Sequence, residues 1–311
     1  MNTISIIIPT YNRNKVLCDT INSIINQCEL IDKKYIYELI IVDQTESHDI
    51  YTKNFLENIQ KFTFIKYHHT STANLPNARN IGIKIAVGNI LVFLDDDVLL
   101  HDGFFDNLLL AYQDYSIMSV VGKPILKNQS GDNVLLRNQS VLKKCAKKIL
   151  QKILGGGNPS IISKFGPILL DTESSKVELV DAGRGCCMSF RKHVFDQIGY
   201  FDSNYIGNAL REETDLFFRM KKAHMKVLFN PLIIVDHLMA DEGGCRAQYS
   251  EKYWQTYFNN QFYFYRKNFK FSKWYINMLL IFDIIKLFKN KMEINRIIQN
   301  SYNRSLSILE F

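Results

Sequence analysis

Three consecutive carboxylates, Asp95, Asp96 and Asp97, stand directly after the apolar run ILVFL at 90–94. Carboxylates crowded at the end of a buried segment cost free energy when they are unpaired. A hard divalent cation such as Mg²⁺ or Mn²⁺ offsets their repulsion, because it prefers carboxylate and phosphate oxygens. We therefore expect a metal site at this position. A solvated acidic turn before a helix is the other interpretation of the same residues.

Other acidic residues also stand where they could act chemically. Asp43 follows a second apolar run, where its carboxylate could accept hydrogen bonds from a base or a ribose, or could begin a turn. Glu212, Glu213 and Asp215 open a helix expected at 212–223. The helix dipole favours acidic side chains in the first turn of a helix. A carboxylate can also serve as a general base, which accepts a proton during a reaction. The residues alone leave both interpretations open.

One histidine follows a third apolar run. A lone histidine such as His237 is more often structural than a metal ligand, although neutral imidazole can bind Mn²⁺. Gly243, Gly244 and Arg246 come shortly after it and favour a mobile loop.

These residues need a scaffold, and the first 120 residues alternate short apolar runs with helical patterns. We expect strands at 4–8, 38–42, 62–67, 90–94 and 117–121, and helices at 13–28, 50–60, 75–87 and 103–113. Apolar strands separated by helices predict an α/β fold with a mainly parallel sheet covered on both faces. Ligands of such sheets bind at the carboxyl ends of the strands, where 9–13, Asp43 and the three aspartates all fall.

The second half of the chain predicts a less regular arrangement. Strands are expected at 177–181, 185–190, 226–229 and 232–236, around the helix at 212–223. The aromatic-rich stretch 247–289 reads as helical. We expect residues 1–245 to form one α/β domain and 246–311 a helical extension packed on it.

Composition narrows the class of protein. The 311 residues are 47% hydrophobic and 22% charged with a net charge of +7, as in a compact globular protein. Basic amphipathic segments at 141–154 and 274–289 predict peripheral contact with an anionic membrane surface or with a partner. The alternative interpretation is that both segments only cover the core. No nucleic-acid-binding motif is present. No signal peptide, apolar run of membrane-spanning length or cysteine framework is visible, so we expect a cytoplasmic protein, peripheral on the inner face of the cell membrane.

Several segments together resemble one family. SIIIPTYNR (5–13), IIVDQT (40–45) and LPNARNIGIKIAVGNILVFLDDD (75–97) are similar, in order and approximate spacing, to those of family 2 glycosyltransferases of the GT-A fold. Three later segments extend the resemblance to about 3–270: DAGRGCCMSFRKHVFDQIGYFD (181–202), REETDLFFRMKKA (211–223) and VDHLMADEGGCR (235–246).

The resemblance implies an activity. It implies a nucleoside-diphosphate sugar donor, a saccharide or lipid-linked saccharide acceptor, a Mn²⁺ or Mg²⁺ cofactor, and inversion at the anomeric carbon of a hexosyl-type sugar. It also implies a role in the assembly of cell-surface polysaccharide or glycolipid. The chain departs from the family pattern at His101, where a proline is usual, and at Glu213, where aspartate is commoner.

The resemblance further implies roles for single residues. Glu213 would be the catalytic base, and Asp97, Asp95 and His237 would hold the metal, with Asp97 as the principal ligand. Arg79 would hold the aspartate loop or the nucleotide, and Asp43 would read the base edge. The remaining residues expected to bind the donor are Pro9, Thr10, Tyr11, Arg13, Asp96, Gly183, Arg184, Glu212 and Arg246.

Two other functions are weighed against this one. A sugar nucleotidyltransferase shares the sheet and the metal, but it needs a glycine-rich basic loop after the first strand, and PTYN at 9–12 is not such a loop. A scaffold without turnover would bind nucleotide or membrane only, and the intact set of acidic residues speaks against it. Metal-dependent release of nucleoside diphosphate from a nucleotide sugar distinguishes all three.

Overall fold

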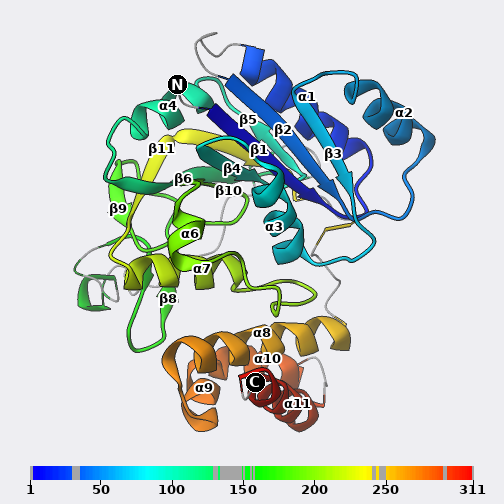
Figure 1. The fold of residues 1–311 in the computed structure, drawn as a ribbon. Helices are drawn as coiled ribbons and strands as arrows, with labels where there is room; N and C mark the ends of the chain where they lie inside the picture. The colour runs from blue at the N-terminus through cyan, green and yellow to red at the C-terminus, as the bar shows by residue number, and fades with distance from the viewer. Residues whose placement is uncertain are drawn as a thin grey trace.

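The computed structural model describes residues 3–29, 36–128, 132–133, 149, 151–154, 156, 158–239, 243–244, 250–289 and 293–309. In these residues a central sheet lies between two layers of helices, and a group of C-terminal helices lies beyond one layer (Figure 1). The nine-stranded sheet has the order β3-β2-β1-β4-β10-β6-β11-β5, with β9 paired to β11.

The first half of the chain forms the parallel part of the sheet. Its strands are β1 (Thr3–Thr10), β2 (Ile36–Asp43), β3 (Ile65–His69) and β4 (Ile90–Leu94), and its helices are α1 (Lys15–Glu29), α2 (Ile50–Ile59) and α3 (Leu75–Ile85). The register places Thr10 beside Asp43, so the ends of β1 and β2 are level. The polar residues that follow these strands therefore meet at one edge.

The second half inserts antiparallel strands and adds helices. Its strands are β5 (Val98–Leu100), β6 (Ile117–Leu126), β9 (Glu178–Val180), β10 (Cys187–Arg191) and β11 (Lys226–His237), with a separate pair β7 (Ile161–Ile162) and β8 (Ile168–Leu169). Its helices are α4 (Phe104–Ala111), α6 (Val194–Ile198), α7 (Glu212–Lys222), α8 (Glu251–Phe269), α9 (Lys273–Leu279), α10 (Ile281–Lys289) and α11 (Ile294–Leu309). The pair β6 and β11 is parallel, whereas β10, β5 and β9 pair antiparallel to their neighbours.

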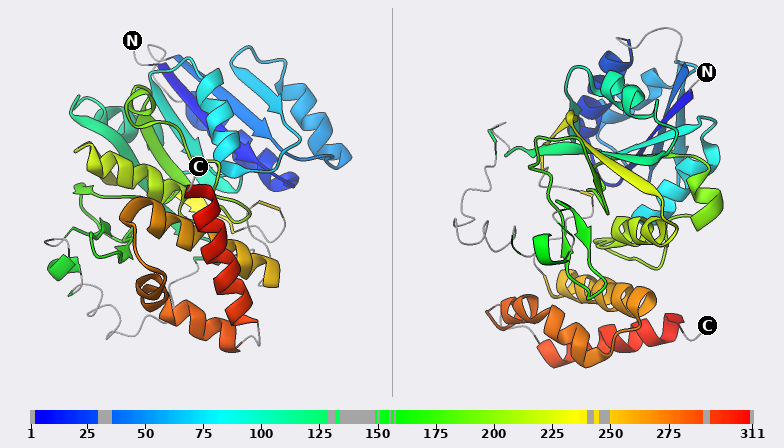
Figure 2. Two further views of the ribbon diagram at one scale, coloured as in Figure 1. Left: turned by 60° about the horizontal axis from the view of Figure 1, so that its bottom comes forward. Right: turned by 90° about the vertical axis from the view of Figure 1, so that its left-hand side faces the viewer.

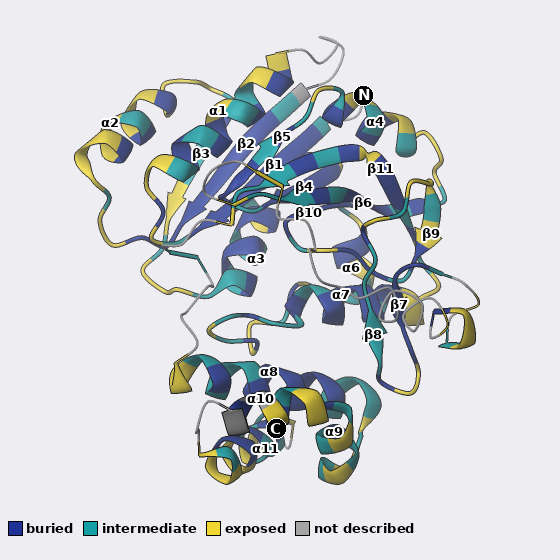
Figure 3. Cartoon of the chain, turned by 180° about the vertical axis from the view of Figure 1, so that it is seen from behind, coloured by how far each residue is buried: buried dark blue, intermediate teal, exposed yellow. Residues whose placement is uncertain are grey.

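Alternation along β1 explains the two helical layers. Ile4, Ile6 and Ile8 face the core formed with α1, α2 and α4. Ile7 faces the opposite core, formed with α3, α6 and α7. A strand whose residues are apolar on both faces must be covered on both sides, as Figure 3 shows by the dark blue central strands. The predicted α/β fold class is confirmed.

Several elements differ from the expected pattern. The strands expected at 226–229 and 232–236 form the single strand β11, which continues through Pro231 because an irregularity between Phe229 and Ile234 absorbs it. The short strands β5, β7 and β8 and the helices α6 and α11 were not predicted. The three strands and α6 have too few residues to show a period, and α11 lies beyond the aromatic stretch.

The helices α8 to α11 form their own aromatic core, and α8 packs against α7 (Figure 2). Lys267 Nζ lies 2.7 Å from Asp202 and 2.9 Å from Asp215, which is fully buried at α7. The predicted domain boundary at 245/246 falls in a stretch outside the described residues and stays a prediction. Within the described residues, each helix is too short or too polar to cross a bilayer.

Candidate active site

A cavity of about 530 Å³ opens at the carboxyl ends of β1 and β4. Of the predicted residues, it is lined by Pro9, Thr10, Tyr11, Arg13, Asp95, Asp96, Asp97 and His237. The remaining wall comes from Gln44, Ala73, Asn74, Leu75, Gly207, Asn208, Gly243, Gly244, Lys252, Tyr253 and Thr256. The wall of this cavity therefore contains residues from the first half of the chain and from helix α8.

Strand pairing brings His237 to the aspartates. After β4 ends at Leu94, the chain turns at 95–97 and returns as β5, whose Val98 pairs with His237 at the end of β11. The Leu238 N–H donates to the Asp97 carbonyl at 2.8 Å. Thr20 of α1 donates its hydroxyl to the Asp96 carbonyl and accepts from the Val98 N–H, both at 3.1 Å. The aspartate loop is thus held from two sides.

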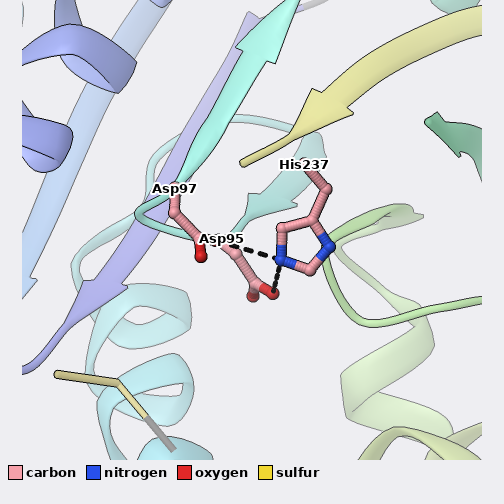
Figure 4. A group of neighbouring side chains, drawn as sticks. All are labelled: Asp95, Asp97 and His237. Atoms are coloured by element: carbon pink, nitrogen blue, oxygen red, sulfur yellow. Dashed lines mark ion pairs between the residues drawn. The ribbon is translucent and has the colours of Figure 1, made fainter. Parts of the chain in front are cut away.

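Asp95, Asp97 and His237 lie as a group that could hold a metal ion (Figure 4). Nε2 of His237 lies 3.0 Å from an Asp97 oxygen and 3.9 Å from an Asp95 oxygen. One ligand atom from each residue falls within 4.8 Å of the others. Two carboxylates and an imidazole are a suitable donor set for Mn²⁺. The two carboxylates without the imidazole also suit Mg²⁺, which prefers oxygen ligands.

Positive side chains neutralise the buried aspartates. Arg13, only 4% exposed, places Nε 3.0 Å from Asp96 and an Nη 3.2 Å from Asp97. Burial raises the pKa of Asp96 to about 6, while Arg13 opposes the shift. Burial alone would lower the pKa of His237, but hydrogen bonds to Asp97 and Cys186 outweigh it and raise the pKa to about 10. The cluster is therefore a place where positive charge is favourable.

Arg79 joins the aspartate loop to α7. Its guanidinium is 1% exposed, pairs with Glu212, and donates to Asp95 at 3.4 Å and to the Gly185 carbonyl at 3.2 Å. These contacts leave Arg79 and Glu212 behind the cavity wall and place them in support of Asp95. A direct contact of Arg79 with the nucleotide stays a prediction.

Glu213, the predicted base, is the second residue of α7 and is half-buried. Burial raises its pKa, and the charges of Arg79 and Arg211 oppose this by less. Unlike Glu212, it has no ion pair within the described residues, so its carboxylate is available to accept a proton. It does not line the cavity itself. Its catalytic role stays a prediction.

Asp43 is fully buried and engaged by other residues. Its carboxylate accepts from the Thr45 N–H at 2.8 Å and from Tyr67 at 2.7 Å, and lies 2.6 Å from Nε2 of His48. The neighbouring Gln44 lines the cavity instead. Contact of Asp43 with a nucleobase stays a prediction.

The glycine loop after β11 lies against the segment after β1. The Gly244 N–H donates to the Tyr11 carbonyl at 2.7 Å, and a Cβ atom at Gly243 would stand 2.0 Å from the Asn12 carbonyl oxygen. Both glycines have positive φ, so other residues would be strained there. Arg246 lies outside the described residues.

The predicted donor-sugar residues Gly183 and Arg184 lie away from the cavity lining. A Cβ atom at Gly183 would stand 2.5 Å from Val121, so this glycine allows close packing on β6, whereas Arg184 is exposed. Sequence reasoning missed the wall contributed by 207–208 and by α8. Gln44 adjoins a predicted site residue and could have been found, but the α8 residues reach the cavity only through tertiary packing.

Comparison with known proteins agrees with this geometry. Glycosyl transferase family 2 matches residues 5–171. The poly(ribitol-phosphate) beta-N-acetylglucosaminyltransferase TarP of Staphylococcus aureus (strain N315) is 30% identical over 123 residues, covering 40% of this chain and 37% of that protein. The GalNAc(5)-diNAcBac-PP-undecaprenol beta-1,3-glucosyltransferase of Campylobacter jejuni is 38% identical over 112 residues, covering 35% of this chain and 34% of that protein. The chain thus spans little more than a third of these relatives.

A solved structure shares the fold. The crystal structure of GalNAc-T7 with UDP, GalNAc and Mn²⁺ has a TM-score of 0.62 and 18% identity to this chain, covering 85% of it and 50% of the other chain. At that identity the likeness concerns the fold alone, and the predicted GT-A fold is confirmed.

Proposed function

Because the chain belongs to glycosyl transferase family 2, we propose that it moves one hexosyl-type sugar from a nucleoside-diphosphate sugar to a hydroxyl group. The acceptor is a saccharide or a lipid-linked saccharide, in cell-surface polysaccharide or glycolipid assembly. The names of two relatives support this class, since one acts on poly(ribitol-phosphate) and the other on an undecaprenol-linked saccharide.

One observation carries the proposal: Asp95, Asp97 and His237 converge at the edge of a cavity of about 530 Å³. Their oxygen and nitrogen atoms fit Mn²⁺ or Mg²⁺, and Asp97, 1% exposed, is the best-anchored ligand. When bound, such a cation would supply Lewis-acid stabilisation of the departing diphosphate. The close-packed glycines 243–244 and the 9–13 segment would exclude water around the phosphates.

The chain's own residues supply the other steps. Glu213 accepts the proton of the acceptor hydroxyl group while the oxygen of that hydroxyl attacks the anomeric carbon. The raised pKa of Glu213 makes its carboxylate a stronger base. Arg79 holds Asp95 in place through its contacts with Glu212 and Gly185. A single displacement of this kind, with the base on the face opposite the leaving group, inverts the anomeric configuration.

The C-terminal helices belong to the same functional unit in this proposal. Residues 1–245 form the catalytic domain, and 246–311 form a helical extension packed on it. Lys252, Tyr253 and Thr256 of α8 line the cavity, which supports a role for the extension in holding the substrates.

The test is a screen of nucleotide sugars for metal-dependent release of nucleoside diphosphate, with Asp97→Asn and with Asp106→Asn as the matched control. Asp106 is an exposed aspartate on α4. We expect release with at least one donor, abolished by chelation of the metal and by Asp97→Asn, but unchanged in Asp106→Asn. Equal release by the two variants would overturn the proposed site.

A further inference from the structure

The helices α9 and α10 present apolar side chains to solvent. Trp274 and Phe282 are 72% and 77% exposed, and Met278, Ile281 and Ile285 are also exposed. Their spacing of three or four residues continues across the boundary between the two helices, so they form one stripe. The buried partners Ile276, Leu280 and Ile284 face the aromatic core on the other side.

A second segment, distant in sequence, packs against α9. The turn between β7 and β8 carries Phe165, which is exposed, and the Tyr275 hydroxyl of α9 donates to its carbonyl at 2.9 Å. A Cβ atom at Gly166 would stand 2.6 Å from Leu279, so the turn packs directly on α9. We call the six exposed residues of the stripe and the turn the apolar patch: Phe165, Trp274, Met278, Ile281, Phe282 and Ile285.

Lysines accompany the apolar patch. Lys164 lies over the Phe165 ring at 5.1 Å, and Lys270 is exposed at the end of α8, shortly before α9 begins. Lys273 is engaged by α11 instead, where its ammonium group donates to Gln299 at 2.6 Å and lies over the Tyr302 ring. Within the described residues, Lys164 and Lys270 form no ion pair. An exposed group of tryptophan, phenylalanine and aliphatic side chains with unpaired lysines beside it is complementary to the headgroup region of an anionic bilayer.

We propose that the apolar patch docks the protein on an anionic membrane surface, with the six apolar side chains in the headgroup and acyl boundary and the lysines at the phosphates. Contiguous exposed apolar side chains of this size mark an interaction site, and the lysines commit it to an anionic lipid surface. The sequence predicted contact through 274–289; the structure adds Lys164 and Phe165 from another part of the chain. The other predicted segment, 141–154, lies mostly outside the described residues.

Docking in this way leaves the cavity accessible. None of the patch residues lines the cavity, which α8 reaches through its first turns at 252–256. The helix α8 connects the two, since its other end leads into α9. A protein held by α9 and α10 would thus keep its transfer site near the membrane without inserting it.

The direct test is binding of the full chain to sucrose-loaded vesicles, followed by sedimentation and by tryptophan fluorescence. The chain has only two tryptophans, and Trp254 is 3% exposed, so Trp274 reports on the patch. We expect binding to vesicles of phosphatidylcholine with phosphatidylglycerol, weakened in high salt, and a blue shift of the emission. Trp274→Phe should still sediment with vesicles but lose the shift.

Two variants and a control decide the assignment. The double variant Trp274→Ser with Phe282→Ser, and the double variant Lys164→Glu with Lys270→Glu, should each lower partitioning about tenfold or more. Leu110→Ser removes another exposed apolar residue, 62% exposed on α4, and should leave partitioning unchanged. The proposal fails if the wild-type protein does not bind anionic vesicles. It also fails if light scattering shows a dimer that the patch variants abolish. The test uses no sugar substrate, so its failure leaves the proposed transfer reaction untouched.

Discussion

The three aspartates have different environments. Asp96 is 5% exposed and pairs with Arg13, Asp97 lies between Arg13 and His237, and Asp95 approaches His237 alone of these two. Charge on a buried carboxylate is tolerated only beside a positive partner. Here Arg13 supplies it permanently, and His237 supplies it only while its imidazole is protonated, a role that a bound cation would take over. Asp96 thus anchors the loop, and Asp95 and Asp97 are left to face a ligand.

Loss of Arg13 should expose this dependence. Arg13→Met leaves Asp96 buried without its partner, and we expect a loss of about 3–5 kcal/mol in unfolding free energy at neutral pH. Adding Asp96→Asn should restore part of that loss, because the uncompensated charge is gone. Urea denaturation of the two single variants and the double variant measures the coupling. A strictly additive double variant would contradict the pairing.

The raised pKa of Glu213 predicts a particular pH dependence. A base must be ionised to act, and burial raises its pKa, so transfer should fall as the pH drops through a value above the usual 4.5. Glu213→Gln should lower kcat by about 10²–10⁴ and remove this acidic limb from the residual rate. The pH profile of kcat/KM is the measurement, with the exposed Glu57→Gln as control. An unchanged limb in Glu213→Gln would assign the base elsewhere.

At the scale of elements, α8 holds the segment that leads into α7. Ala209 and Arg211 have positive φ values of 49° and 78°, which are unfavourable for residues other than glycine. Asn260 of α8 donates to the Ile206 carbonyl at 2.8 Å and accepts from its N–H at 3.1 Å, and Gln261 accepts from Arg211 at 3.0 Å. The strained turn before Glu213 therefore depends on the C-terminal helices.

Asn260→Ala tests that dependence. We expect a loss of about 1–3 kcal/mol in stability, because buried backbone groups lose their partner. We also expect kcat to fall between about ten- and a hundredfold through misplacement of α7, with little change in donor KM. The exposed Asn303→Ala on α11 is the matched control. A folded Asn260→Ala protein with wild-type kcat would show that α8 supports stability alone.

Glu38 joins β2 to β1 and to the end of α3. It accepts from Ser5 at 2.5 Å and from the Val87 N–H at 2.7 Å, and it pairs with Lys66 at 2.6 Å. Burial would raise its pKa, but these partners outweigh burial and lower it below 4.5. A depressed folded-state pKa gives stability that is present above 4.5 and is lost as the pH falls through the folded value.

Glu38→Gln should therefore destabilise the protein by about 1–3 kcal/mol at neutral pH, and the difference from wild type should shrink in acid. Thermal or urea unfolding across acidic pH measures it, with Glu57→Gln on α2 as control. A difference that stays constant down to the lowest pH would rule out the ionised form as its source.

The elements that the sequence predicted well are those with a local signal. Continuous apolar runs identified β1, β2 and β4, and helical spacing identified α1 and α7. Where the chain depends on distant pairing, local signals fail: β11 continues through Pro231 because β6 pairs with it on both sides of the irregularity.

At the scale of the whole molecule, the same limit applies to the site. The residues at 9–13 and 95–97 could be placed because strand ends converge in a parallel sheet. Lys252, Tyr253 and Thr256 could not, because α8 reaches the cavity only by packing against the Gly207 loop, where a Cβ atom would stand 2.7 Å from Thr256. The cavity is thus built from both halves of the chain.

The molecule has two separate candidate binding surfaces, the cavity at the edge of the sheet and the apolar patch. The first is lined by acidic and basic groups that suit a cation and phosphates, and the second by apolar groups with lysines. Because the two surfaces share no residue, substitutions that disrupt one of them should leave the other intact.

The central claim is that Asp95, Asp97 and His237 hold a cation that in turn holds a donor diphosphate. Electron paramagnetic resonance of Mn²⁺, titrated with protein in the presence of each common nucleoside diphosphate, tests it most directly. The account predicts Mn²⁺ uptake that requires one of these nucleotides, is lost in Asp97→Asn and persists in Asp106→Asn. Uptake that is absent with every nucleotide, or is equal in the two variants, would contradict it.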